Sequence, residues 1–426
     1  MKRPNHLTLL TGAWLMVAAT VFGASLPETR SIFPLQDKHV HSSSIVECAN
    51  GDLLACWFHG SGERSANDVV VRGSRLKAGS DSWSPVFVMA DTPDLPDCNP
   101  VLFVDPQQRV WLFWMVVAGN RWENSILKYR RADSCGEEGA PDWNWQDIII
   151  LKPGEGFPQA IARGFKALDA EEGCWGEYAP PYEKLVEEAA KDSAKRQRGW
   201  MTRIHPLVLS SGRWLLPLYS DGFNLALVGI SDDQGATWQA SAPIVGYGPI
   251  QPSLVQRRDG TVLAFLRDSG GAPQRIQWSQ STDNGQTWSP SRDMDIPNPS
   301  SSLEVGVLQD GRWLLVCNDT EDGRHQLAAF VSEDEGATWS WRKQIEPADS
   351  IGQSFGYPSV VQGRDGRVHL TYSRQTSQGR TIQHTVLPLS WFGGEALSAE
   401  REARTTGVAG ATPTTALRLA VSDDHR

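Results

Sequence analysis

Short apolar segments separated by tight turns recur six times along the chain. In each copy an apolar strand leads into a turn that usually contains Asp-Gly or Asn-Gly, and a second apolar strand follows, which is the pattern of a β-hairpin. The six predicted hairpins are Ser44–Trp57 around Gly51, Pro100–Trp114 around Gln108, Pro206–Tyr219 around Gly212, Pro252–Arg267 around Gly260, Leu303–Asn318 around Gly311 and Pro358–Tyr372 around Gly366.

An eight-residue motif, Ser-x-Asp-x-Gly-x-Thr-Trp, also repeats. Its copies are Ser231–Trp238, Ser281–Trp288 and Ser332–Trp339, and they begin 50 and 51 residues apart. The Asp can accept amide protons of the turn, and the Gly can adopt the positive φ that the turn requires. We expect the closing Trp of each copy to pack between neighbouring repeat units.

Six units of about fifty residues, each with two hairpins, predict an all-β chain folded as a six-bladed β-propeller. A stacked solenoid is the competing architecture, but solenoid repeats are usually shorter or helical. One interval between turns is about twice as long as the others, which indicates an insertion at about residues 152–200. A helix is expected there at Glu183–Arg198, packed on the rim as a lid or a brace.

The two ends of the chain lack this repeat. Residues 1–23 combine Lys2 and Arg3 with an apolar run and then small residues, which predicts a cleaved signal peptide and export to the periplasm or the extracellular space. A single membrane anchor is the alternative, although the run is near the lower length limit of a spanning helix. The propeller is expected over residues 24–393, and residues 394–426 are expected to form a disordered tail.

Composition narrows the partners. The net charge of −10 provides no basic face for phosphate backbones, so a nucleic-acid partner is disfavoured. No later segment is apolar enough for stable membrane insertion after signal cleavage. Six cysteines permit disulfides, and Cys135 with Cys174 is the favoured pair because both lie in loop-like sequence. The sequence contains no CxxC or HExxH cluster, so we expect no metal site and no cofactor, and it leaves the oligomeric state open.

Polar and aromatic residues stand where the predicted first strand of each blade begins. These strands line the central channel of a propeller, so residues at equivalent positions converge there. We expect a pocket at one channel mouth, and the alternative is that these side chains only solvate it. Three arginines nearby predict binding of a carboxylate or a sulfate. The residues at the strand starts are His41, Asn99, His205, Gln251, Ser302 and Tyr357, and the arginines are Arg203, Arg267 and Arg324.

The eight-residue motif is known as an Asp box. Its three copies on six predicted blades resemble the sialidase (neuraminidase) superfamily, in particular its exported bacterial branch, over about residues 33–392. The resemblance implies a retaining, exo-acting glycoside hydrolase, an exo-alpha-sialidase, whose partner is an acidic glycan. Members of this family use an arginine triad for the substrate carboxylate, a Tyr nucleophile assisted by Glu, and an Asp acid/base. Arg267 and Arg324 match the second and third arginines of the triad, and Tyr357 matches the nucleophile.

Other positions depart from the family pattern. His41-Ser42-Ser43 stands where the family has Arg-Ile-Pro, and Gln251, which cannot take a proton, stands in place of the Glu. The acid/base region extends from Gly60 to Asp68, and within it Glu63 lies nearer the expected place than Asp68.

These matches define the first functional hypothesis. Arg203 would supply the missing guanidinium and hold the substrate carboxylate with the two matched arginines. Glu63 would protonate the leaving oxygen and Tyr357 would attack the anomeric carbon, oriented by His205 or Gln251.

Two further hypotheses remain open at the level of sequence. A propeller without the first arginine and the activating Glu can bind a glycan and perform no chemistry, with Trp edges stacking on sugar faces. Alternatively, Tyr357 or His205 would remove a proton beside the carboxylate of a uronic acid, which is lyase chemistry. An unsaturated product that absorbs in the ultraviolet would distinguish elimination from hydrolysis.

Overall fold

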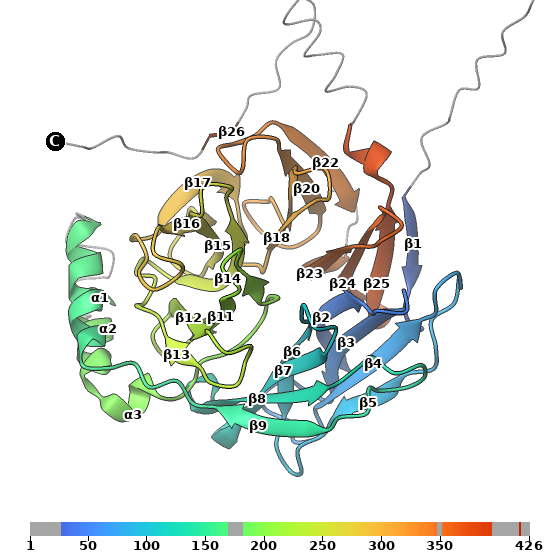
Figure 1. Ribbon diagram of the computed structural model, residues 1–426, viewed down its shortest axis with the longest axis horizontal. Helices are drawn as coiled ribbons and strands as arrows, with labels where there is room; N and C mark the ends of the chain where they lie inside the picture. Colours follow the sequence, from blue (N-terminus) through green and yellow to red (C-terminus); the bar gives the residue numbers. More distant parts are fainter. Residues whose placement is uncertain (1–26, 169–181, 347–351, 394–416, 419–426) are drawn as a thin grey trace, which may run out of the picture.

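The computed structural model describes residues 27–168, 182–346, 352–393 and 417–418. Six four-stranded antiparallel sheets stand around a central axis, as Figure 1 shows. The predicted six-bladed β-propeller is therefore confirmed. The predicted signal peptide lies outside the described residues, and so does the predicted tail apart from residues 417–418.

Five blades are continuous meanders in which the first strand is innermost. From the inner to the outer strand, blade 1 contains β2 (His39–Glu47), β3 (Leu53–Gly60), β4 (Val70–Leu76) and β5 (Phe87–Ala90), and blade 2 contains β6 (Asp97–Val104), β7 (Val110–Val117), β8 (Ser125–Ala132) and β9 (Trp145–Ile149). Blade 3 contains β10 (Leu207–Val208), β11 (Trp214–Ser220), β12 (Leu225–Ser231) and β13 (Gln239–Ala240), and blade 4 contains β14 (Pro249–Gln256), β15 (Val262–Asp268), β16 (Arg275–Ser281) and β17 (Arg292–Pro297). Blade 5 contains β18 (Glu304–Val307), β19 (Trp313–Cys317), β20 (Leu327–Ser332) and β22 (Trp341–Glu346).

The sixth blade joins the two ends of the propeller. It consists of β23 (Ser354–Gln362), β24 (Val368–Thr376), β25 (Gly379–Leu387) and, as its outer strand, β1 (Glu28–Ser31). Strand β1 runs antiparallel to β25 and places Glu28 opposite Val386, next to β25 in Figure 1. A short strand, β21 (Thr338–Trp339), pairs separately with β26 (Leu417–Arg418). The sequence predicted two hairpins in every unit, whereas the last unit contributes three strands and an N-terminal strand supplies the fourth.

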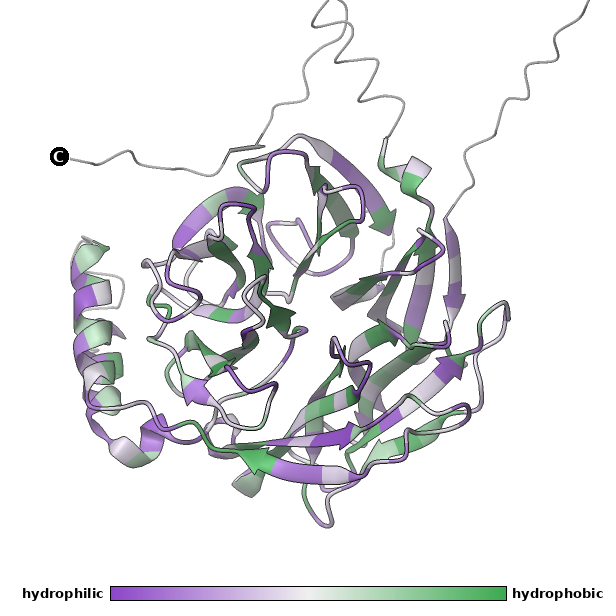
Figure 2. Ribbon diagram, in the orientation of Figure 1, coloured by the Kyte–Doolittle hydropathy of each residue, from purple (hydrophilic) through white to green (hydrophobic). Residues whose placement is uncertain are grey.

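The core lies between neighbouring blades, because each sheet is buried on both faces. Hydrophobic residues are concentrated on the strands in Figure 2, while many loops are polar. Trp111 of β7 meets Trp214 of β11 edge to face, with ring centroids 5.5 Å apart. The Asp-box Trp339 packs in the same way on Phe265 of blade 4, at 5.7 Å. Inter-blade packing of this Trp, expected from the sequence, is confirmed.

Each Asp box closes its own turn by the same set of hydrogen bonds. In the second copy Asp283 Oδ1 accepts from Ser281 Oγ at 2.7 Å and from the Thr287 amide at 2.9 Å, while Asp283 Oδ2 accepts from Thr287 Oγ1 at 2.5 Å. Gly285 adopts a φ of +83° and donates its amide proton to Ser281 Oγ. The Asp side chain therefore acts as a turn former.

The insertion after blade 2 is helical, with more helix than the sequence analysis expected. The predicted helix at 183–198 is present as α2 (Tyr182–Lys191) followed by the short α3 (Ser193–Arg196), and α1 (Gly156–Ala167) was missed. Phe157, Ile161 and Phe165 of α1 lie four residues apart and are buried against blade 3, a spacing that was available in the sequence. Because the helices stand beside blade 3 in Figure 1, the insertion acts as a brace.

The disulfide differs from the expected one. Cys135 is bonded to Cys48, not to Cys174, which lies outside the described residues. Cys48 follows the inner strand of blade 1 and Cys135 follows β8 of blade 2, so a separation of 87 residues along the chain conceals two adjacent positions in the fold. None of the described helices has both the length and the apolar character needed to cross a membrane.

Candidate active site

The repeat register places one residue of every blade at the same level of the channel. The turn residue of each first hairpin has a positive φ, and the residue nine positions before it, such as Gln251 before Gly260, belongs to this level. Its members are Ser42, Asn99, Arg203, Gln251, Ser302 and Tyr357. Four of them were predicted from the sequence, but His41 and His205 were expected at this level where the register has Ser42 and Arg203.

A β-bulge marks this level in four blades. The ladder shifts register there between β2 and β3, β6 and β7, β14 and β15, and β23 and β24. At the shift Ser42, Asn99, Gln251 and Tyr357 adopt φ values of 60°, 45°, 53° and 58°. An extra residue in a strand redirects its side chain, and a non-glycine residue at such a φ costs about 1–3 kcal/mol. The bulges therefore hold these side chains at the channel at some expense in stability.

Tyr357 lies at the centre of the mouth, surrounded by guanidinium groups. Arg267, the penultimate residue of β15, donates from Nη1 to the Tyr357 hydroxyl at 2.9 Å. The guanidinium carbons of Arg203 and Arg324 lie 4.9 and 5.5 Å from the centre of the Tyr357 ring. Burial alone would raise the pKa of this hydroxyl, but Arg267, Arg324 and a hydrogen bond from Gln251 outweigh it and hold the pKa below its usual value. The surroundings of Tyr357 thus favour its phenolate form.

The two arginines that match the triad are held at the surface of this mouth by backbone and hydroxyl groups. Arg267 donates from Nε and Nη2 to Ser300 Oγ at 3.1 and 3.0 Å, and Arg324 donates to the Ser300 carbonyl at 2.6 Å. Burial lowers the pKa of Arg324, and the charge of Arg267 lowers it further. Since neither has an ion pair with a carboxylate among the described residues, both remain available to an anionic ligand.

Arg203 has a different position from the other two. Its side chain is 2% exposed and donates to the carbonyls of Ser43 and Pro358 at 3.4 and 2.9 Å. Burial lowers its pKa, although the nearby carboxylate of Glu304 raises it. Arg203 therefore lies beneath the Tyr357 ring as a fixed positive charge, not as an open ligand for substrate.

His41 occupies the position of the first family arginine. Its ring centroid lies 4.0 Å from that of Tyr357, and Nδ1 shares a hydrogen bond of 2.9 Å with Ser373 Oγ. Burial and the charges of Arg324, His39, Arg203 and Arg267 hold the pKa of His41 well below 6.5. His41 is therefore neutral near pH 7 and does not replace the charge of an arginine.

Gln251 is hydrogen-bonded to the side chains of both Tyr357 and Tyr219. Its Nε2 donates to the Tyr357 hydroxyl at 3.4 Å, and its Oε1 lies 3.5 Å from Arg267 Nη1. Asn99, the equivalent residue of blade 2, donates to the Tyr219 hydroxyl at 3.0 Å. Both amides thus present N–H groups to phenolic oxygens, so neither can accept a proton from them.

The two predicted carboxylates of blade 1 have unequal positions. Glu63 lies near the mouth, with Oε1 3.2 Å from His39 Nε2. Burial would raise the pKa of Glu63, but His39, Arg64 and Arg324 together bring it below 4.5. Asp68 instead accepts from Ser61 and Lys38, which lowers its pKa strongly, and so it supports the loop that carries Glu63.

His205 lies one level deeper in the channel. It is seven residues before Gly212, and Glu304 and Ser44 are seven residues before their own turns. His205 Nδ1 lies 2.5 Å from Glu304 Oε1, and Nε2 lies 3.1 Å from Ser44 Oγ. His205 and Glu304 line a cavity of about 480 Å³ that otherwise has mainly apolar walls. The structure thus separates His205 from the mouth residues, whose level includes Arg203.

Two residues of the mouth, Asp221 and Tyr219, were not predicted from the sequence. Asp221 follows β11. Burial raises the pKa of its carboxyl, although the charges of Arg267 and Arg64 oppose the rise. Tyr219 stands seven residues after the blade 3 turn, as Arg267 does in blade 4. Aligning the second strands of the repeats as well as the first ones would have identified Tyr219, because it is equivalent to Arg267.

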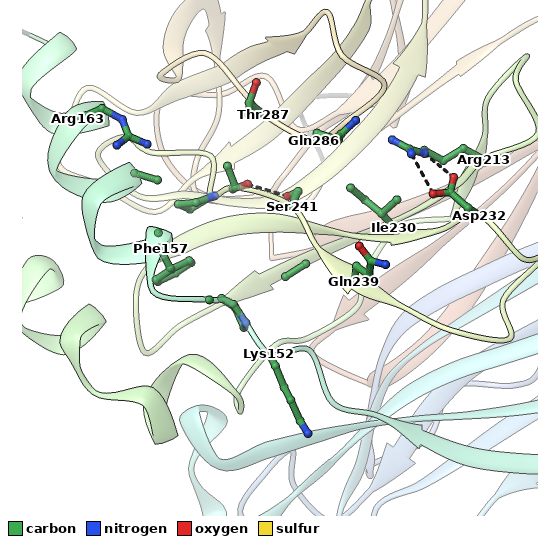
Figure 3. A pocket seen from close by; sticks show the side chains of 17 residues that line it. Lys152, Phe157, Arg163, Arg213, Ile230, Asp232, Gln239, Ser241, Gln286 and Thr287 are labelled. Atoms are coloured by element: carbon green, nitrogen blue, oxygen red, sulfur yellow. Dashed lines mark hydrogen bonds and ion pairs between the residues drawn. The ribbon is translucent and has the colours of Figure 1, made fainter.

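Another cleft lies away from the mouth, on the outer side of blade 3. It has a volume of about 440 Å³ between α1 and strands β12 and β13, and Figure 3 shows Lys152, Phe157 and Arg163 on its helical side. Arg213 on the opposite side is paired with Asp232 at 2.7 Å. No residue predicted for the active site lines this cleft. Among the described residues, no three His, Cys, Asp or Glu side chains gather as metal ligands would.

A six-bladed propeller with Asp boxes and a Tyr–Arg mouth defines a sialidase-like protein. The model of the BNR repeat-like domain matches residues 51–164 and 198–370. The chain belongs to this family, within the sialidase superfamily.

Individual relatives share only part of their sequence with this chain. A sialidase of Micromonospora viridifaciens is 30% identical over 174 residues, which cover 38% of this chain and 25% of the relative. The chain thus matches only a quarter of the length of that protein. Among solved structures, a protein of unknown function from Dyadobacter fermentans superposes with a TM-score of 0.62 and 17% identity, over 84% of this chain and 97% of that one. A leech intramolecular trans-sialidase, in complex with 2,7-anhydro-Neu5Ac, gives a TM-score of 0.63 and 12% identity, over 86% and 71%. These structures share the fold.

Proposed function

We propose that this protein is an exo-acting, retaining glycoside hydrolase that removes a terminal acidic sugar, as an exo-alpha-sialidase does. The observation that carries the proposal is the surroundings of Tyr357, whose hydroxyl accepts from Arg267 at 2.9 Å while two further guanidiniums flank its ring. A phenolic nucleophile suits a substrate that carries its own carboxylate, because it approaches with less charge repulsion than a carboxylate nucleophile. The names of the relatives support the same class of reaction.

The arginines at the mouth bind the substrate in this proposal. Arg267 and Arg324 hold the carboxylate of the sugar, with their guanidinium planes fixed by Ser300. Planar, bidentate guanidiniums match the geometry of a carboxylate. This binding places the anomeric carbon above the Tyr357 hydroxyl.

The chemistry then proceeds in two displacements. The phenolate oxygen of Tyr357 forms a bond to the anomeric carbon while the bond to the leaving oxygen breaks, and this oxygen takes a proton from the Glu63 carboxyl. Water next attacks the anomeric carbon and gives its proton to the Glu63 carboxylate, and the bond to Tyr357 breaks. Because Gln251 donates an N–H to Tyr357, the positive charges around the ring activate the nucleophile, not a general base.

Asp221 is the competing acid, because its pKa is raised whereas that of Glu63 is lowered. The variants Glu63→Gln and Asp221→Asn distinguish the two on a pair of substrates. An aryl glycoside with a good leaving group needs little protonation, and an alkyl glycoside needs much. The variant that lacks the true acid loses activity on the alkyl glycoside and retains activity on the aryl glycoside. The activity of the other variant changes by the same factor on both substrates.

The test of the function itself is turnover of fluorogenic sialosides and uronides by the wild type and by Tyr357→Phe. Release from an acidic glycoside that is lost in the variant supports the proposal, and full activity in Tyr357→Phe overturns the assignment of the nucleophile. A glycan-binding propeller is the second candidate, favoured by the amide at Gln251. It predicts glycan binding without release by either protein.

A further inference from the structure

A small cavity opens beside Tyr357, between blades 1 and 6. It has a volume of about 200 Å³, and its charged and titratable lining residues are His39, His41, Glu63, Arg324, Arg374 and Arg380. Whole-ligand pockets usually measure about 300–1,000 Å³. This cavity therefore suits one substituent of a sugar and not a complete ring.

Two of these arginines come from the last hairpin of the propeller. Arg374 of β24 pairs with Thr381, and Arg380 of β25 pairs with Gln375, so both stand near the end of the hairpin. Arg374 donates from Nε to Gln353 Oε1 at 2.9 Å. Arg380 donates from Nη1 to His39 Nδ1 at 2.6 Å. Each guanidinium thus has a side-chain hydrogen-bond partner that fixes its direction.

The charge of the cavity is positive within the described part of the chain. Arg374 and Arg380 form no ion pair there, in contrast to Arg367 of the same blade, which lies 2.7 Å from Asp365. Glu63 is the one carboxylate among the lining residues, and its Oε1 faces His39. Three guanidiniums therefore share a cavity with one carboxylate, and an anion there would relieve their repulsion.

One wall of this cavity lies at the position where the family resemblance implies an arginine. His41 stands at that position with a shorter side chain, directed toward Ser373 and the Tyr357 ring. The space beside it extends to Arg374 and Arg380, which approach from the opposite wall. The positive charge of the cavity thus comes from Arg324 and from strands β24 and β25 of blade 6.

We propose that this cavity, formed by Arg324, Arg374 and Arg380, is a subsite for a second anionic group of the substrate, either a sulfate ester or a second carboxylate. The inference rests on the proposed function, because the sugar at Tyr357 places the second group. It makes a doubly anionic glycan the preferred substrate. Arg374 and Arg380 determine this specificity and take no part in bond breaking.

Inorganic sulfate is the first probe, because its binding requires no turnover. Calorimetric titration uses Arg267→Ala, which removes the neighbouring carboxylate site, and the same protein with Arg374→Ala and Arg380→Ala added. We expect the added changes to weaken sulfate binding at least tenfold, while Arg367→Ala added in their place leaves it unchanged. Equal sulfate affinity in all these proteins overturns the subsite.

Arg380→Ala also removes the partner of His39, so Arg374→Ala alone serves as a second test. It keeps the contact between Arg380 and His39, and it should weaken sulfate binding at least threefold. If Arg374→Ala binds sulfate as tightly as its parent, the subsite as drawn is wrong even if the double change has an effect.

The two sources of the anion are distinguished with matched glycosides. Sulfated, dicarboxylate and singly carboxylated versions of one acidic glycoside are compared by KM and kcat. The doubly anionic form that fits has a KM at least tenfold lower than the single carboxylate, and Arg374→Ala removes this advantage without changing kcat. Hydrolysis of all three forms with equal KM leaves the hydrolase intact and refutes the subsite. Binding of sulfate without hydrolysis of any form retains the anion site and refutes the proposed function.

Discussion

The Asp-box turns and the Tyr357 mouth contrast within the same repeat. In the turns every charged oxygen of the aspartates is hydrogen-bonded to neighbours within eight residues, and the three copies agree closely. At the mouth the equivalent residues of the six blades are all different except for Ser42 and Ser302, and four have positive φ values. Arginines there lie beside one another without carboxylate partners among the described residues.

The contrast shows which positions serve the fold and which serve a ligand. A side chain whose hydrogen-bond partners all lie in the same turn stabilises that turn in any blade. The same residue can therefore occur in several repeats. Unpaired charge and backbone strain reduce stability, so they persist where binding or chemistry uses them. Substitutions in the two regions should accordingly have opposite effects on activity and stability.

The largest effect is expected from Arg267→Ala. This change removes the hydrogen bond to the Tyr357 hydroxyl and one ligand of the substrate carboxylate, so kcat/KM should fall about 10²–10³-fold. The free energy of unfolding should change by less than about 1 kcal/mol, since repulsion with Arg324 is relieved. Steady-state kinetics and urea unfolding measure the two quantities. A large loss of stability with unchanged kinetics would show that Arg267 belongs with the structural residues.

Gln251→Glu should increase activity by about tenfold in kcat. A carboxylate at this position can accept the proton of Tyr357, and a positioned general base contributes about 10²–10⁴-fold in favourable cases. Arg267 keeps the new carboxylate ionised, because Oε1 of residue 251 lies 3.5 Å from its Nη1. Gln251→Ala serves as the control for loss of the amide. A decrease in kcat in the Glu variant would contradict activation by a base at this position.

Asp283→Ala should have the opposite profile. It leaves the amides of Gln286 and Thr287 without their acceptor in an exposed turn, which costs about 1–2 kcal/mol in the free energy of unfolding. The kcat of the variant should equal that of the wild type, because this turn follows the end of β16 in blade 4 and lies away from the mouth. Reduced kcat at full stability would connect the box to the active site.

The smallest effect concerns pH. Burial would raise the pKa of Asp283, but hydrogen bonds from Thr287 and Ser281 outweigh it, and the pKa lies below 3.8. A folded pKa below the unfolded value, about 3.9, means that the contribution is complete above that pH and disappears as the pH falls through the folded pKa. The difference in melting temperature between the wild type and Asp283→Ala should therefore shrink between pH 5 and pH 2. A constant difference would contradict this origin of the stability.

Much of the architecture followed from local signals. Apolar alternation, turn residues and the Asp boxes predicted the blades, because each hairpin is made by residues within about fifteen positions of one another. The repeats also predicted Tyr357, Gln251, Arg267 and Arg324 near one mouth. Helix α1 shows that a readable spacing, Phe157, Ile161 and Phe165, was overlooked.

Other features required the closed ring. The disulfide joins Cys48 to Cys135 across two blades, and β1 completes blade 6 from the opposite end of the chain. The cavity at Arg374 and Arg380 depends on the contact between the first and last blades. No spacing within one repeat encodes such contacts.

The sequence by itself determined the number of blades, the positions of their turns and the chemical types at the channel, since these depend on short-range patterns. Only the tertiary structure decided which of these side chains meet. It placed Arg203 beneath Tyr357, left His41 neutral and put His205 one level deeper. The physical reason is that burial, bulges and mutual charge act among residues more than 300 positions apart in the sequence, such as His41 and Ser373, which are separated by 332.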